Sequence, residues 1–508
     1  MSEQVLTKKP NIFVRMGKGI GNWFKNLGRA IANFFVSLGK GIAKGFRNFG
    51  ERFVDGSVGT KISHFIMGAG NFQHKQIAKG CIFLAVEILF VLFMVLCPSI
   101  NNTPLGYKAL ANLGNLGYIE GAGNDGMAID PITGLPVQVP NSMLILLFGV
   151  VTIGVIFLFL IVYFANISSA YKADLDERYG EGATPFKKDL AEMLDSKFHI
   201  TMLSPTVIGV MLFTILPTIY MILVAFTGYG GVIAAQGQVN FGWVGFDNFI
   251  NIFTNSDSEI GQRFLSVLGW TLVWAFFATF TNYFGGIFLA VLINRKGIKG
   301  KVVFRTVFIL TIAIPQFISL LAMRNLLSLH GPVNEMLMNM NLIKEPINFL
   351  GHDLENQNEY LTKFMIILIN MWIGIPYTML MTSGILMNVP ADLYEAAKVD
   401  GAKPFTIFFK ITFPYIFFIT TPYLISSFIG NITSFNIIFM LTGGGPAVAG
   451  FKAGKTDLLV TWLYKLTVDN TMYNEGAVIG IITFICTSLI TLVTYRRSKS
   501  YKEEDTFQ

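Results

Sequence analysis

Two long apolar stretches of the chain contain polar and aromatic residues of the kinds that bind a small polar solute. The first stretch contains Asn370, Trp372, Gly374 and Tyr377, and the second contains Asn431, Thr433, Ser434 and Asn436. Amide and hydroxyl groups exchange hydrogen bonds with sugar hydroxyls, and aromatic faces pack against the apolar side of a sugar ring. The same groups also form hydrogen bonds between helices inside a membrane. Taken alone, these residues support both interpretations equally.

A short polar segment between the two stretches is the second candidate. It reads Glu-Ala-Ala-Lys-Val-Asp-Gly over residues 395–401. The small side chains of Ala396 and Ala397 keep its surface low, so another protein could approach closely. The segment therefore indicates a docking surface on which Glu395 is available to a basic partner.

The residues around this segment predict its local structure. Pro390 can start a helix at its first position, and Asp392 then falls in the positively polarised first turn. Gly401 can take the left-handed conformation that ends a helix, and Pro404 can start a second helix that runs into the next apolar stretch. We predict a helix, a turn and a helix.

The elements that position both candidates must lie in a membrane. Of the 508 residues, 53% are apolar and 14% are charged, and the mean hydropathy is +0.56, values unlike those of a soluble globular protein. Cys81, Cys97 and Cys486 fall within or at the ends of apolar runs and lack metal-ligand spacing. We interpret them as reduced packing residues.

Eight apolar windows reach the roughly 20 residues that a helix needs to cross a bilayer. They lie near 77–97, 142–166, 200–226, 266–294, 304–326, 362–388, 415–441 and 475–495. The sequence therefore predicts an all-α integral membrane protein with eight transmembrane helices.

The distribution of basic residues predicts the orientation of these spans. Alternate segments (1–79, 167–199, 295–305, 389–414 and the tail after residue 495) contain 30 of the 38 Lys and Arg residues. Because Lys and Arg favour cytoplasmic loops, both termini and the Glu395 loop are expected in the cytoplasm. The net charge of +7 then reflects orientation and contact with anionic lipid, without any need for a nucleic-acid partner.

Residues 1–76 are predicted to form a cytoplasmic basic amphipathic region. Apolar residues recur every three or four positions between 20 and 53, and basic residues between 15 and 47 fall on the opposite face. The motif Gly-Lys-Gly-Ile occurs at 17–20 and again at 39–42. We expect this helix to lie on the inner leaflet and bind anionic lipid. The alternative is that it packs on the protein's own spans.

The predicted spans give the domain organisation. The first two transmembrane helices and their external loop occupy 77–199. A core of six helices occupies 200–497 and includes the polar loop 389–414. Residues 498–508 form a cytoplasmic tail.

No catalytic constellation accompanies these elements. A phosphate-binding loop needs a glycine five residues before its Gly-Lys-Thr, but Ala449 occupies that position before Gly454-Lys455-Thr456. The five histidines are scattered and have no paired ligands. We therefore expect neither an enzyme, nor a metal, nor a cofactor in this chain.

Glu87 is the one acidic residue well inside a predicted span. An intramembrane carboxylate is a functional candidate by default, so Glu87 supports a proton-coupled secondary sugar transporter as an alternative function. A proton relay usually needs more than one such group, and we favour a Glu87 that is protonated or hydrogen-bonded to a neighbouring helix. A scaffold protein without transport activity would leave the docking segment unexplained.

The docking segment resembles the cytoplasmic loop of the permease subunits of ATP-binding-cassette importers. That motif is Glu-Ala-Ala, three residues, Gly, nine residues, Ile, one residue and Leu-Pro, and here it runs from Glu395 to Pro414 with Phe413 in place of Leu. Most of 200–497 is similar to the MalF-type subunit of maltose and maltodextrin importers, with related stretches at 370–377, 390–396, 441–446 and 456–460.

This resemblance implies the type I importer permease architecture and a set of partners. The partners would be a second, MalG-like permease, a cytoplasmic MalK-like ATPase homodimer that binds ATP and Mg, and an extracellular sugar-binding protein. In the best-known member a large external domain lies between spans three and four, whereas the loop here covers only about 227–265. A contact with the binding protein must therefore be made differently.

The resemblance also assigns residues. The ATPase-coupling residues would be Glu395, Ala396, Ala397, Asp400 and Gly401. The positions that contact maltose in the family correspond to Asn370, Gly374, Tyr377, Asn431 and Ser434, with Ser434 replacing an amide. Gly430 stands where the family has an aromatic residue, which implies a roomier pocket.

Overall fold

The computed structural model describes residues 12–96, 103, 105–119, 127–129, 134–138, 140–180, 182, 185–237, 239–254, 259–295, 297–352 and 357–497. Its contacts divide the chain into two units. Unit 1 comprises Met1–Gly114 and Ile145–Leu216, and unit 2 comprises Asn115–Leu144 and Pro217–Gln508. Cys97, the tail 498–508 and much of the loop after the first span lie outside the described residues.

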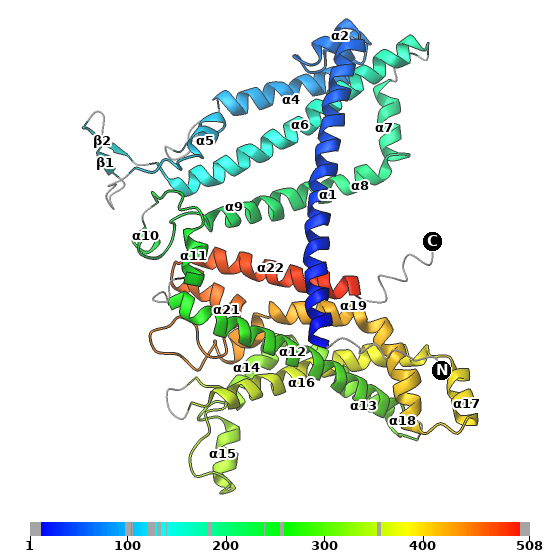
Figure 1. The fold of residues 1–508 in the computed structure, drawn as a ribbon, viewed down its shortest axis with the longest axis vertical. Coiled ribbons are helices and arrows are strands. Elements are labelled where there is room, and N and C mark those ends of the chain that lie inside the picture. The colour runs from blue at the N-terminus through cyan, green and yellow to red at the C-terminus, as the bar shows by residue number, and fades with distance from the viewer. Residues whose placement is uncertain are drawn as a thin grey trace, which may run out of the picture. The chain divides into compact units, whose positions relative to one another are not determined.

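Unit 1 is built from helices (Figure 1). They are α1 (Ile12–Asp55), α2 (Val58–Ile62), α3 (Ala69–Gln73), α4 (Ile77–Leu96), α5 (Tyr107–Asn112), most of α6 (Ser142–Arg178), α7 (Phe186–Leu194) and α8 (Phe198–Val210). The amphipathic pattern predicted for the first 76 residues forms α1, a single helix of 44 residues.

The carboxyl end of α1 packs on the polar end of α6. The Phe49 ring lies 6.2 Å from the Phe164 ring and 4.8 Å from the His64 ring. Arg52 donates a hydrogen bond to Ser168 Oγ at 2.5 Å. The alternative of packing on the protein's own spans is therefore correct for the last turns of α1.

Unit 2 contains the remaining elements, and their bounds are as follows. They are β1 (Met127–Ile129), β2 (Pro136–Gln138), α9 (Leu216–Val224, which starts at the unit boundary), α10 (Gly231–Ala235), α11 (Asp247–Thr254), α12 (Glu259–Asn294), α13 (Lys301–Ala313), α14 (Gln316–Leu326), α15 (Pro332–Asn339), α16 (Glu359–Met387), α17 (Ala391–Val399), α18 (Pro404–Ile407), α19 (Phe413–Ile432), α20 (Asn436–Leu441), α21 (Leu459–Tyr464) and α22 (Tyr473–Arg497). Strands β1 and β2 form a small antiparallel hairpin in which Met127 is paired with Gln138.

Among the described residues, seven helices are long and apolar enough to cross a membrane, or eight if one bent pair counts as a single span. The bent pair is α13 and α14, which meet at 94°. Ile314 is extended there and Pro315 caps α14, because a proline disfavours helical geometry in the residue before it. The prediction of one continuous span over 304–326 is therefore corrected to a broken one.

The predicted span 415–441 is also corrected. The helix that enters it begins earlier, at Pro404, and continues through a π-helical turn at Phe408–Thr412 to Ile432. The chain then breaks before the short helix α20. Ser434 lies in this break and not within a span.

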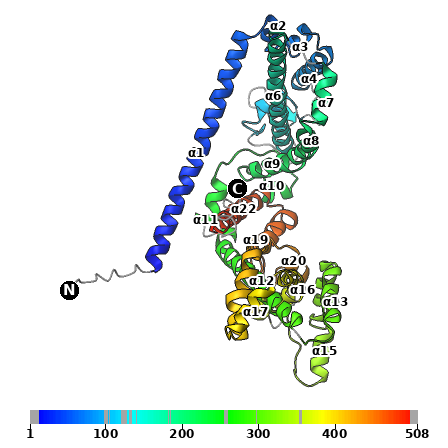
Figure 2. The same ribbon diagram turned by 90° about the vertical axis from the view of Figure 1, so that its right-hand side faces the viewer.

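Helix α12 lies at the centre of unit 2, next to α16 and α19 in both views (Figures 1 and 2). Trp274 is fully buried and donates its indole N–H to the carbonyl oxygen of Asn431 at 3.1 Å. The Tyr283 hydroxyl lies 2.7 Å from Thr420 Oγ1. Both partners belong to α19, so α12 is hydrogen-bonded to that helix at two points along its length.

The loop that follows α20 is organised around a buried carboxylate. Asp457 is 1% exposed and accepts hydrogen bonds from the Gly454 N–H at 2.7 Å, the Thr461 hydroxyl at 2.9 Å and the Lys465 ammonium at 2.6 Å. A buried carboxyl group is tolerated only when its oxygens are paired in this way, because a buried polar group without partners costs free energy. Gly454, which the sequence places in a Gly-Lys-Thr tripeptide, thus has a structural role in this loop.

Candidate functional site

Helices α12 and α16 approach so closely that a glycine is required at their crossing. A Cβ atom on Gly374 would lie 2.1 Å from Nδ2 of Asn282. One turn further along α12, a Cβ atom on Gly286 would lie 2.4 Å from Cβ of Thr378. Small residues at such crossings let membrane helices pack backbone to backbone. Gly374 therefore makes room for the Asn282 amide.

The two asparagines predicted to bind solute both bond to α12. Asn370 is 4% exposed and donates its amide to the Ala278 carbonyl at 3.3 Å. Asn431 donates to Oγ1 of Thr279 at 2.9 Å. Because Ala278 and Thr279 are consecutive, the two amides contact α12 at the same height along that helix. The structure thus shows the hydrogen bonds between helices that are the alternative to sugar binding for these residues.

The predicted aromatic residue has a different environment. Tyr377 is 51% exposed, and its ring centre lies 5.8 Å from that of Tyr423 on α19. The Tyr423 hydroxyl is in turn 3.3 Å from Thr378 Oγ1. These two rings, on neighbouring helices, form an open aromatic surface against which the apolar face of a sugar ring can pack.

The other predicted residues lie at the end of α19. The Ser434 N–H donates to the Asn431 carbonyl at 3.3 Å, so the two residues are joined through the backbone. Gly430 is exposed, and a Cβ atom added to it would meet nothing within 4 Å. The roomier sugar pocket expected from Gly430 stays a prediction.

Asn282 is the residue of this region that the sequence analysis missed. Its Oδ1 atom is buried and has no hydrogen-bond partner within the described part of the chain. A buried amide oxygen left unpaired costs free energy, so such an atom is a natural acceptor for a ligand or a water. Asn282 can be recognised only when it is known which residues of α12 face Gly374 of α16. The sequence patterns of the two helices do not contain this register.

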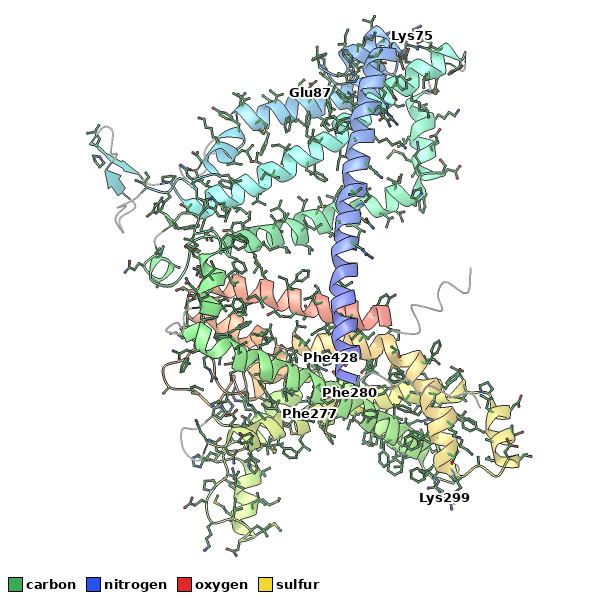
Figure 3. All side chains as sticks on the ribbon, in the orientation of Figure 1. Lys75, Glu87, Phe277, Phe280, Lys299 and Phe428 are labelled. Carbon is green, nitrogen blue, oxygen red and sulfur yellow. The ribbon has the colours of Figure 1, made fainter. Side chains whose placement is uncertain are left out.

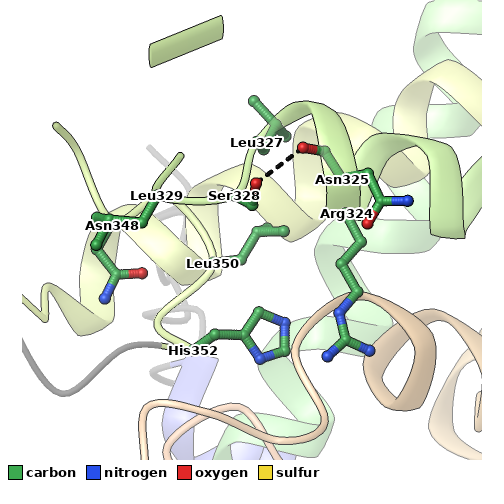
Figure 4. A pocket seen from close by; sticks show the side chains of 8 residues that line it. All are labelled: Arg324, Asn325, Leu327, Ser328, Leu329, Asn348, Leu350 and His352. Carbon is green, nitrogen blue, oxygen red and sulfur yellow. Dashed lines mark hydrogen bonds between the residues drawn. The ribbon is translucent and has the colours of Figure 1, made fainter. Parts of the chain in front are cut away.

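A small pocket lies at the far end of α14 (Figure 4). It has a volume of about 180 Å³, and its lining includes Arg324, Asn325, Asn348 and His352. His352 Nε2 lies 2.6 Å from the Leu441 carbonyl oxygen, which ties the pocket to α20. With guanidinium and amide donors together, the pocket can bind a carboxylate or a group of hydroxyls.

The predicted docking segment has the predicted outline. Pro390 is the N-cap of α17 and not its first residue, which corrects the expected position by one residue. Asp392 lies in the first turn of the helix. Gly401 has a φ of 73° and follows the end of α17, and α18 begins at Pro404.

The surface of α17 is open to a partner. Glu395 and Ala396 are exposed, and no added atom on Gly401 would meet a neighbour within 4 Å. Large apolar side chains accompany them, with Leu393 46% exposed and Val399 88% exposed. An exposed apolar patch beside charged groups marks a protein interaction surface.

A hydrogen bond joins α17 to the next span. The Tyr394 hydroxyl lies 3.2 Å from Oγ1 of the buried Thr412. Thr412 belongs to the π-helical turn that leads directly into α19. Movement of α17 is therefore coupled to α19 by both the chain and this contact.

Glu87 lies on α4 in unit 1 (Figure 3). Its Oε2 atom accepts a hydrogen bond from the Met67 N–H at 2.8 Å. This agrees with the interpretation that Glu87 is hydrogen-bonded, although the partner belongs to a turn and not to a helix.

Comparison with known proteins identifies the family. Residues 282–499 match the family described as "Binding-protein-dependent transport system inner membrane component". The chain is 32% identical over 445 residues to the galactooligosaccharides transport system permease protein GanP of Bacillus subtilis (strain 168), covering 86% of this chain and 97% of that protein. The chain belongs to this family of importer permeases. The predicted ATP-binding-cassette permease of MalF type is thereby confirmed.

Two further relatives are similar. The maltodextrin transport system permease protein MalC of Streptococcus pneumoniae serotype 4 is 32% identical over 448 residues, which cover 87% of this chain and 95% of MalC. The maltose/maltodextrin transport system permease protein MalF of Escherichia coli (strain K12) is 36% identical over 252 residues, or 49% of this chain and 46% of MalF. Nothing in these relationships supports the proton-coupled alternative.

The α12–α16 crossing gives a first prediction. Replacing Gly374 by Val should force Asn282 from its position and destabilise the protein by about 1–3 kcal/mol, as overpacking does. The matched control is Gly384→Val on the same helix, where an added Cβ meets nothing within 4 Å. Thermal unfolding in detergent measures both, and equal midpoints for the two variants would contradict the close approach at Gly374.

Proposed function

We propose that the chain is the membrane-spanning subunit of an ATP-driven importer of oligosaccharides of the maltodextrin type. The observation that supports this most strongly is its near full-length similarity to permeases named for galactooligosaccharides and maltodextrin. The open Tyr377–Tyr423 surface beside the α12–α16 crossing is consistent with a hydroxyl-rich solute.

The proposal includes partners that this chain does not supply. A second, MalG-like permease would complete the translocation pathway. A MalK-like ATPase homodimer would bind ATP and Mg and hydrolyse the nucleotide, and an extracellular binding protein would deliver the sugar. Both termini and α17 would lie in the cytoplasm and the spans in the plasma membrane of a bacterial cell, an orientation that the alternation of basic segments supports.

The ATPase contact would be formed by Glu395, Ala396, Ala397, Asp400 and Gly401. Exposed Leu393 and Val399 would add apolar area to that contact. Closure of the ATPase dimer would then displace α17, and the Tyr394–Thr412 contact would transmit the displacement to α19.

Charge reversal at α17 tests the contact. Glu395→Arg should lower both co-purification of the ATPase and sugar uptake about tenfold or more, since loss of a central interface contact costs about 2 kcal/mol. The exposed Glu345 on another loop provides a matched control, Glu345→Arg. Normal co-purification by Glu395→Arg would remove this residue from the interface.

The sugar contacts would involve Asn370, Gly374, Tyr377, Asn431 and Ser434. Asn370 and Asn431 would have to exchange their bonds with α12 for bonds to the sugar, or hold α16 and α19 at the spacing that the sugar requires. Tyr377 and Tyr423 need no such exchange, because their rings are already accessible.

Transport assays separate these residues. Tyr377→Ala should raise the KM for uptake up to about tenfold, because packing of an aromatic face contributes about 0.5–1.5 kcal/mol. Tyr360→Ala on the outer turn of the same helix should leave the KM unchanged. Asn370→Ala should reduce uptake as well. Normal uptake at normal expression would exclude either residue from the site.

We also propose that α1 lies at the inner membrane surface and contacts anionic lipid. Phe49 touches Phe164, near the end of the apolar part of α6, so the apolar face of α1 lies at the depth where α6 leaves the bilayer. Phe46 is 71% exposed on that face, and Lys40, Lys44 and Arg47 are exposed on the opposite face. Such a helix binds an interface through its apolar face and anionic lipid through its basic face.

Spin labels on the two faces test this placement in the full chain after its own cysteines are replaced. In phosphatidylglycerol vesicles a label at Phe46→Cys should be accessible to oxygen in the lipid, and a label at Lys44→Cys should be accessible to a water-soluble relaxant. Equal accessibility of both labels to the aqueous reagent would place α1 outside the membrane surface.

A further inference from the structure

A second cavity lies in unit 1, at the charged ends of α4 and α6. It has a volume of about 730 Å³ and is lined from α4, α6, α7 and the residue before α8. Lys79 is the third residue of α4, and Lys172 lies in the polar end of α6. The cavity therefore lies where the apolar parts of α4 and α6 end and their charged ends begin.

Positive charge collects in this cavity. Lys79, Lys172 and Lys197 all line it. Glu192 offsets one of them, because it accepts a hydrogen bond from Lys197 Nζ at 3.0 Å and that hydrogen bond lowers the pKa of the glutamate. The described lining thus holds three lysines and no acidic residue, and Glu192 and Asp176 beside it compensate their charge in part.

Other walls of the cavity are apolar. Ile82 of α4 is 51% exposed, and Leu190 and Met193 of α7 are 48% and 44% exposed. The hydroxyls of Ser168 and Ser169 provide polar atoms beside them. A soluble anion would gain nothing from the apolar walls, whereas a molecule with a charged head and hydrocarbon chains would contact both kinds of wall.

We propose that this cavity binds the headgroup of an anionic phospholipid, with its phosphate among Lys79, Lys172 and Lys197 and its acyl chains along Ile82 and the apolar face of α7. Basic pockets between membrane helices are suited to such headgroups, and ammonium groups donate charge-assisted hydrogen bonds to phosphate oxygens. The bound lipid fastens α7 to the two spans. This inference depends on the membrane location of unit 1 and is independent of the transported solute and of the ATPase.

The test is a titration of the full-length protein in neutral detergent with phosphatidylglycerol, in which native mass spectrometry counts the lipids bound per chain. Replacement of Lys79, Lys172 and Lys197 by Gln should weaken binding about a hundredfold, and Lys172→Gln alone about fivefold, from the contribution of each basic residue near a lipid surface. Lys172 is exposed, so this single variant retains the fold.

A matched control removes equal charge from the same unit outside the cavity. Lys61, Lys187 and Lys188 do not line it, so their replacement by Gln should change the affinity less than twofold. Glu192→Gln should tighten binding, because it releases Lys197. Phosphatidylcholine should bind more weakly than phosphatidylglycerol to the unaltered chain.

Two results would overturn the proposal. One is equal affinity of the cavity variant and the control variant for phosphatidylglycerol. The other is displacement of the lipid by free glycerol phosphate at the lipid's own concentration, which would identify the ligand as a soluble anion. Neither result would bear on sugar uptake.

Discussion

The contact between α12 and α16 is the constraint on which unit 2 depends. Gly286 lets α12 lie directly against Thr378 and the Met379 backbone N–H of α16, and Gly374 leaves room on α16 for the Asn282 side chain. Once α16 is fixed there, α12 presents its other side to α19, where Trp274 and Tyr283 form hydrogen bonds. The Trp270 indole N–H, also on α12, donates a hydrogen bond to the Thr456 carbonyl oxygen at 3.0 Å. This bond attaches the loop between α20 and α21 to α12.

This arrangement divides the polar residues of the spans into two kinds. Asn370 and Asn431 are held by bonds to α12, so their amides set the spacing of the helices. Tyr377 and Tyr423 contact each other, and the Tyr423 hydroxyl lies 3.3 Å from Thr378 Oγ1, while the Tyr377 ring is exposed and the Tyr423 ring is half-buried. The bonded amides keep the helices at a constant spacing, and the accessible rings can bind a solute and release it again. A translocation pathway requires both.

Much of this organisation can be predicted from the sequence. The apolar windows predict the membrane helices, since length and hydropathy are the requirements for crossing a bilayer. Pro390, Gly401 and Pro404 predict the outline of α17 and α18 because their backbone preferences are local. The amphipathic period predicts α1 for the same reason.

The predictions are wrong or incomplete where two effects compete or where distant segments meet. The high hydropathy of residues 304–326 predicts one continuous span, but Pro315 breaks the helix within it. The role of Asn282 and the three-lysine cavity depend on which residues of distant segments meet, and this is set by helix packing. Patterns of single helices do not contain such information.

The helix from Pro404 to Ile432 has a mechanical consequence. Its 29 residues extend about 43 Å at 1.5 Å per residue, and its backbone hydrogen bonds resist compression along that length. Thr412 lies near one end, held by Tyr394, and Asn431 lies at the other, held by α12. A force applied at α17 therefore reaches the α12 contact as tilt or rotation of this helix, with that contact as its pivot. The π-helical turn and Pro422 are the places where the helix itself can bend or twist.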